Sequence, residues 1–127
     1  MRLKDNHMSI GIWSENYEVL AKWYEEVLGF SPKEKMQLPN DTYIAFDFGP
    51  ENDHFFIGKH DKIKGENTDP YRIMIGFHVE SVTKMYQDLE DKDITFVAKP
   101  FQAPTGKFWC MTIKDPEGNM LQFTGQE

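Results

Sequence analysis

Residues 7–30, HMSIGIWSENYEVLAKWYEEVLGF, predict a strand followed by an amphipathic helix. Aliphatic residues occupy every second position of the first seven, which is the period of a half-buried strand. From Leu20 to Leu28 the apolar residues recur at spacings of three and four, so that they form one stripe along a helix. Gly29 stands where this helix should end, because glycine commonly follows the last helical turn.

The same order of elements begins again at residue 71. Residues 71–79, YRIMIGFHV, again place apolar side chains at every second position, and Ser81 is the expected N-cap of a second amphipathic helix. Shorter apolar runs predict the remaining strands, at 31–38, 42–48, 54–59, 94–98, 107–113 and 119–124.

This repeated order predicts a single domain, residues 1–127, made of two βαβββ modules. The modules are expected at 5–59 and 71–125, and a polar linker at 60–70 joins them. Because a module of this size would be marginally stable alone, the two should pack together.

The composition limits the classes of partner. The net charge is −7, from 14 Lys and Arg against 21 Asp and Glu, so neither nucleic acid nor an anionic membrane surface is expected as a partner. Cys110 is the only cysteine of the sequence. It therefore has no partner for a disulfide within the chain, and a Cys-rich zinc site is excluded. No apolar run is long enough to span a bilayer, and the first residues lack the apolar core of a secretory signal, so we expect a cytoplasmic protein.

Three segments resemble the vicinal oxygen chelate superfamily, which includes glyoxalases, bleomycin-resistance proteins, fosfomycin-resistance thiol transferases and extradiol dioxygenases. Residues 7–30 are similar to its opening, residues 74–81 to the opening of its second module and residues 113–123 to its last hairpin. The resemblance implies an α+β fold of the glyoxalase/bleomycin-resistance type. In that fold the sheets curl into a cup and the helices pack outside it.

The strand faces that lack the aliphatic residues should line this cup. Aromatic residues make up 14% of the chain, so either an aromatic-lined cavity or a Phe-rich core is expected. The residues predicted to bind a ligand are His7, Ser9, Trp13, Phe56, Arg72, Met74, His78, Phe108 and Gln122.

The resemblance also implies where a divalent metal would be held, at His7, Phe56, Met74 and Gln122. Of these, His7 is a good ligand, whereas Gln122 is a weak neutral one and Met74 is a soft thioether. Phe56 has no donor atom. A catalytic ion of this kind needs about three good ligands, so no metal cofactor is expected.

The sequence is compatible with two functions. The first is a binding protein that takes a small, partly apolar molecule in its cup without a full metal site. The alternative is a glyoxalase-like, divalent-metal-dependent lyase or transferase that acts on a small oxygenated substrate, with a ligand that the sequence does not identify. Whether the protein is an enzyme stays open at this point. A homodimer is expected, because small members of the resembled family pair and because open sheet edges favour pairing.

Overall fold

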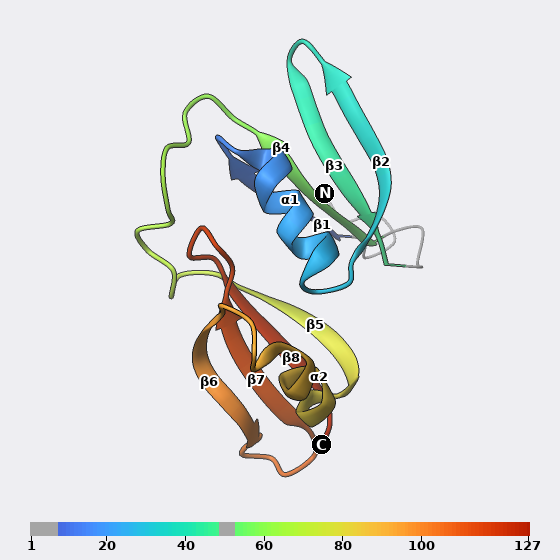
Figure 1. Ribbon diagram of the computed structural model, residues 1–127, viewed down its shortest axis with the longest axis vertical. Helices are drawn as coiled ribbons and strands as arrows, with labels where there is room; N and C mark the ends of the chain where they lie inside the picture. The colour runs from blue at the N-terminus through green and yellow to red at the C-terminus, as the bar shows by residue number, and fades with distance from the viewer. Residues whose placement is uncertain (1–7, 49–52) are drawn as a thin grey trace, which may run out of the picture. The chain divides into compact units, whose positions relative to one another are not determined.

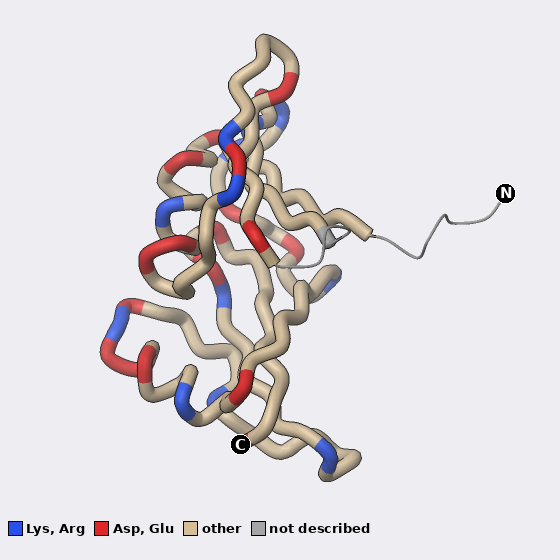
Figure 2. The backbone as a smooth tube through the Cα atoms, turned by 90° about the vertical axis from the view of Figure 1, so that its right-hand side faces the viewer, with Lys and Arg blue, Asp and Glu red and all other residues tan. Residues whose placement is uncertain are grey.

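A computed structural model describes residues 8–48 and 53–127 of the chain (Figure 1). The chain divides into two compact units, residues 1–65 and 66–127, and the boundary lies within the polar residues 60–70. Each unit holds one four-stranded sheet and one helix. Acidic and basic residues are interspersed along the backbone of both units (Figure 2).

The first unit has the predicted order of elements. They are β1 (Met8–Ser14), α1 (Tyr17–Glu26), β2 (Ser31–Leu38), β3 (Asp41–Asp47) and β4 (Asp53–Lys59). The sheet has the order β1-β4-β3-β2, in which β1 runs parallel to β4 and the other pairs are antiparallel.

Helix α1 packs against one face of this sheet, on β1, β3 and β4 (Figure 1). Its Tyr24 is fully buried, with its ring centroid 5.5 Å from that of Phe55 and 6.4 Å from that of Phe46. Gly29 adopts a φ of +77°, a conformation that glycine reaches without strain, and it ends the helix as predicted. The chain then folds back, so that the amide of Phe30 donates to the carbonyl of Tyr24 at 3.1 Å.

The second unit repeats this topology. Its elements are β5 (Met74–Ser81), α2 (Val82–Leu89), β6 (Thr95–Gln102), β7 (Trp109–Lys114) and β8 (Met120–Gln126). The order β5-β8-β7-β6, with β5 parallel to β8, matches that of the first sheet. The predicted cap is confirmed, because the Ser81 hydroxyl accepts a hydrogen bond from the Lys84 amide at 3.1 Å.

Helix α2 covers one face of the second sheet, and the core lies between them. Leu121, Met111 and Ile113 are completely buried, and the Phe77 and Phe123 rings stack with centroids 5.8 Å apart. These are the faces that the alternation of apolar residues assigned to the core.

The β7–β8 turn is held by a buried carboxylate. Asp115 is 4% exposed, and its Oδ1 accepts hydrogen bonds from the amides of Glu117 and Asn119, each at 2.9 Å. The amide of Gly118 donates to the Asp115 carbonyl at 3.0 Å, and Gly118 closes the turn with a φ of +83°. The amide of Asn67 donates to the Glu117 carbonyl, so this turn also anchors the start of the unit.

Most strand boundaries differ from the prediction by one or more residues. Strand β5 begins at Met74 rather than at 71, because the preceding residues form a turn in which the amide of Arg72 donates to the carbonyl of Asp69. Strand β7 begins at Trp109, which leaves Phe108 just outside it. Strand β6 continues to Gln102 through Pro100, which an edge strand tolerates because one of its sides has no ladder partner in this sheet.

The described residues form two helices, α1 and α2, and neither is long and apolar enough to cross a membrane.

Candidate functional site

Three aromatic rings cover the face of the first sheet that lies opposite α1. Trp13 comes from β1, Phe56 from β4 and Tyr43 from β3. The ring centroid of Phe56 lies 5.5 Å from that of Trp13 and 5.4 Å from that of Tyr43, so the three rings are continuous. We call this set the aromatic floor. Trp13 keeps 40% of its surface exposed, although its neighbours on the helix-facing side are buried.

Two glycines make room for these rings. Gly11 is the β1 partner of Phe56, and a Cβ atom at Gly11 would overlap the Phe56 ring. Gly58 is the β4 partner of Trp13, and a Cβ atom there would lie 2.7 Å from the Trp13 ring. Each ring therefore lies over the bare backbone of the glycine on the neighbouring strand.

Tyr43 adds a polar group, its phenol hydroxyl, to the floor. Desolvation raises the pKa of Tyr43 above its ordinary value of 10.0, and the carboxylates of Glu34 and Asp41 raise it further. The phenol therefore stays protonated at neutral pH and can donate a hydrogen bond. Near Trp13, the imidazole of His60 meets the indole edge to face at 5.6 Å.

The corresponding face of the second sheet is polar. The Thr124 hydroxyl and Nδ1 of His78 are hydrogen-bonded at 2.9 Å across the β5–β8 pair. Gln122 lies between Gly76 and Thr112 in the strand register, and the space above Gly76 is open. On this face of β7, Thr112 is only 5% exposed. A residue that lines an open cup is expected to be more exposed than this.

The structure brings some predicted site residues together. Trp13 and Phe56 are in direct ring contact. Ser9 is exposed on the same face, opposite His54. In the second unit Met74 and Gln122 share one face of the paired strands β5 and β8, two positions apart in register, and His78 lies on that face as well.

Other predicted site residues are placed differently. Arg72 precedes β5, and its Nε forms an ion pair with Asp69 at 2.6 Å, so its assignment to a strand facing the cup is wrong. Phe108 also lies outside its strand, and it is 39% exposed. His7 lies outside the described residues. The prediction missed Tyr43. It lies three residues before the buried Phe46 on β3 and so points to the opposite face, which carries the floor.

The side chains at the implied metal positions do not fit a divalent ion. Phe56 offers a hydrocarbon ring, and that ring is already packed over Gly11. Met74 offers a thioether and Gln122 a neutral amide, neither of which offsets the dehydration of a divalent cation. Within residues 8–48 and 53–127, no three His, Cys, Asp or Glu side chains gather in a way that could hold a metal.

A shallow cleft of about 450 Å³ lies on the other side of the first sheet, between α1 and β2. Its rim carries charges that pair with each other, as Lys35 does with Glu18 at 3.8 Å and Lys22 with Glu26 at 3.7 Å. Such exposed ion pairs contribute little free energy to stability or to binding. The aromatic floor is therefore the better candidate site in this unit.

Comparison with known protein families identifies one that matches most of the chain. A family model described as the Glyoxalase/Bleomycin resistance protein/Dioxygenase superfamily matches residues 6–123. A search of curated proteins finds no match.

Three solved structures illustrate the similarity of fold. A member of that superfamily from Sphaerobacter thermophilus DSM 20745 is 19% identical, with 97% of this chain and 98% of that chain covered and a TM-score of 0.78. TioX from Micromonospora sp. ML1 is 14% identical, with coverages of 96% and 99% and a TM-score of 0.72. A lactoylglutathione lyase from Agrobacterium tumefaciens is 15% identical, with coverages of 98% and 96% and a TM-score of 0.70.

Proposed function

The chain belongs to the glyoxalase/bleomycin resistance protein/dioxygenase superfamily, and from this premise we propose that it binds a small planar molecule without a metal centre. The observation that carries this proposal is the aromatic floor. Three rings from three strands form one continuous apolar surface, and a planar ligand would gain both area burial and ring stacking on it.

The glycines support the same conclusion. If the rings were ordinary packing on an exposed sheet, a side chain at Gly11 or Gly58 would cover the strand equally well. Instead both positions are bare, and the rings lie low over the backbone. The Tyr43 hydroxyl would then fix the orientation of the ligand by donating a hydrogen bond.

Trp13 should report binding. Titration with acridine, a neutral three-ring probe, is expected to quench tryptophan fluorescence, because the indole would stack on the probe. Trp13→Phe should remove most of this quenching and shift the melting temperature by only a few degrees, since the side chain is partly exposed and a ring is retained. Isothermal titration calorimetry gives the affinity independently of the fluorophore.

The matched controls are the other two tryptophans. Trp23 lies on α1, packed against Tyr24, and Trp109 shares one side of β7 with the buried Met111, so neither belongs to the floor and replacing either with Phe should leave the quenching in place. Gly11→Ala should weaken acridine binding, because its new methyl group displaces the Phe56 ring. Quenching that survives Trp13→Phe, or a Trp13→Phe protein that does not fold, would contradict the assignment of this face.

We further propose that the protein works without a resident metal. The purified protein should carry far less than one divalent ion per chain by elemental analysis, because the donors at the implied positions are too weak. Titration with Ni²⁺ or Zn²⁺ should show only weak binding. A stoichiometric ion that is lost in His7→Ala would contradict this and would favour the lyase or transferase alternative.

We also propose a cytoplasmic homodimer. The edge strands β1, β2, β5 and β6 each have one ladder partner within their own sheet, and pairing between chains would cover such edges.

A further inference from the structure

The aromatic floor lies in an acidic setting. The strand register places Glu34 and Asp41 on the same face as Tyr43, and both carboxylates act electrostatically on its hydroxyl. Glu34 belongs to the edge strand β2, so it also borders the cleft beside α1.

The lysines of the same strands lie on the other side. Lys35 pairs in register with Ile44 on the helix-facing side and reaches Glu18 of α1. Lys33, at the β2 bulge, lines the cleft beside α1. Lys59 pairs in register with the buried Ser14. Among the described strand residues of the first unit, the face that carries the floor therefore has carboxylates but no Lys or Arg.

The rings themselves add to this polarity. The face of an aromatic ring carries negative potential, and indole attracts a cation more strongly than phenol or benzene does. Trp13 is the most exposed large ring of the floor. A ligand that stacks there would thus meet a negative surface below it, and the carboxylates of Glu34 and Asp41 flank Tyr43 on the same face.

We propose that the floor selects a planar organic cation, such as an N-alkylated heteroaromatic ring, over neutral or anionic molecules of the same shape. This inference rests on the proposed binding function and names the ligand class for the same site. Charge complementarity carries it, because stacking alone would accept all three kinds of ligand equally.

Three probes with one ring system separate charge from shape. They are N-methylacridinium, acridine at a pH well above its own pKa, and acridine-9-carboxylate. Calorimetric titration at low salt should give a Kd for the cation about tenfold lower than for acridine, a difference of about 1.4 kcal/mol. The anion should bind more weakly than acridine, and added salt should reduce the advantage of the cation.

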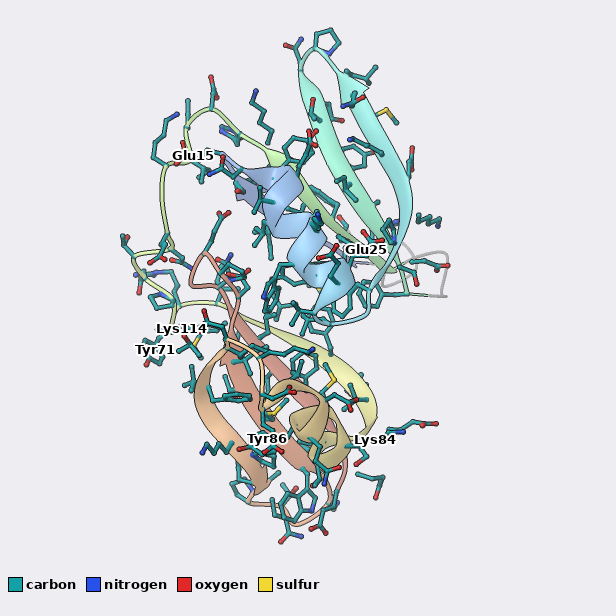
Figure 3. All side chains as sticks on the ribbon, in the orientation of Figure 1. Glu15, Glu25, Tyr71, Lys84, Tyr86 and Lys114 are labelled. Carbon is teal, nitrogen blue, oxygen red and sulfur yellow. The ribbon has the colours of Figure 1, made fainter. Side chains whose placement is uncertain are left out.

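A pair of double variants tests which charges are responsible. In Glu34→Gln/Asp41→Asn the ratio of the acridine Kd to the cation Kd should fall towards one, while acridine itself binds as before. In the control, Glu25→Gln/Glu26→Gln, the net charge changes by the same amount at two exposed positions of α1 (Figure 3), the helix on the other face of this sheet, and the ratio should be unchanged.

The outcomes are distinguishable. If acridine binds as tightly as the cation, the charge preference is wrong but the binding function stands. If the two double variants lower the ratio equally, net charge alone explains it and the assignment to Glu34 and Asp41 fails. If none of the three probes binds, both this inference and the proposed function are overturned.

Discussion

Gly125→Ala is expected to destabilise the second unit severely. A Cβ atom at this position would overlap the backbone carbonyl of Val79 on the neighbouring strand β5. A backbone group inside a sheet cannot rotate away as a side-chain end can, so β5 and β8 would have to separate. We expect a loss of at least about 3 kcal/mol in the free energy of unfolding, at the upper end of overpacking effects. Thermal unfolding followed by circular dichroism should show a melting temperature lower by about 10 °C or more.

Gly76→Ala is the matched control for this variant. Gly76 lies on β5, the other strand of the same pair, but nothing lies within 4 Å of a Cβ atom built there. Replacing it should leave the melting temperature unchanged or raise it slightly, because alanine costs less chain entropy than glycine on folding. Equal melting temperatures for the two variants would show that the close approach at Gly125 is unimportant.

Asp115→Ala should have the second largest effect. The side chain is buried and accepts from two backbone amides, and its Oδ2 accepts from Nδ2 of Asn119 at 2.9 Å. Removing it leaves these donors without their acceptor, and hydrogen bonds to a charged group contribute about 1.5–3 kcal/mol each. We expect a loss of about 3 kcal/mol, measured by urea denaturation monitored by fluorescence.

Two variants delimit this effect. Asp61→Ala removes a carboxylate whose side chain is 92% exposed, so it should change stability by less than about 0.5 kcal/mol. Asp115→Asn keeps an oxygen for the two backbone amides but sets its NH₂ group against the donor of Asn119, so it should lie between the wild type and Asp115→Ala. A stability of Asp115→Ala equal to that of Asp61→Ala would contradict the role given to the turn.

Local residue patterns predicted the helices and strands well, because these elements depend mainly on residues that are close together along the chain. The alternation in residues 7–13 identified a strand with one buried face, and the structure has Ile12 buried and Trp13 exposed there. Gly29 and Ser81 mark helix ends through bonds to residues only a few positions away. The strand at 31–38 was predicted from weaker signals and is found at the same residues.

The predicted positions were wrong where strand pairing or packing selected a backbone conformation that the local residue pattern did not. The apolar run at 94–98 predicted a strand of that length, but β6 is an edge strand and continues past Pro100 to Gln102. Arg72 continued the alternation of the fifth strand, yet Asp69 holds it in the preceding turn. In each case the residue pattern was compatible with two backbone conformations, and packing or pairing selected one.

The sequence by itself determined the order of elements and the helix-facing side of strands such as β1, because side-chain period and helix ends follow from local backbone geometry. Only the tertiary structure decided which side chains meet. Gly11 and Phe56 are separated by a helix and two strands, and they are partners solely because β1 pairs in parallel with β4. The register of that pair places a bare glycine beneath each ring, and no local pattern encodes a register between strands so far apart in the chain.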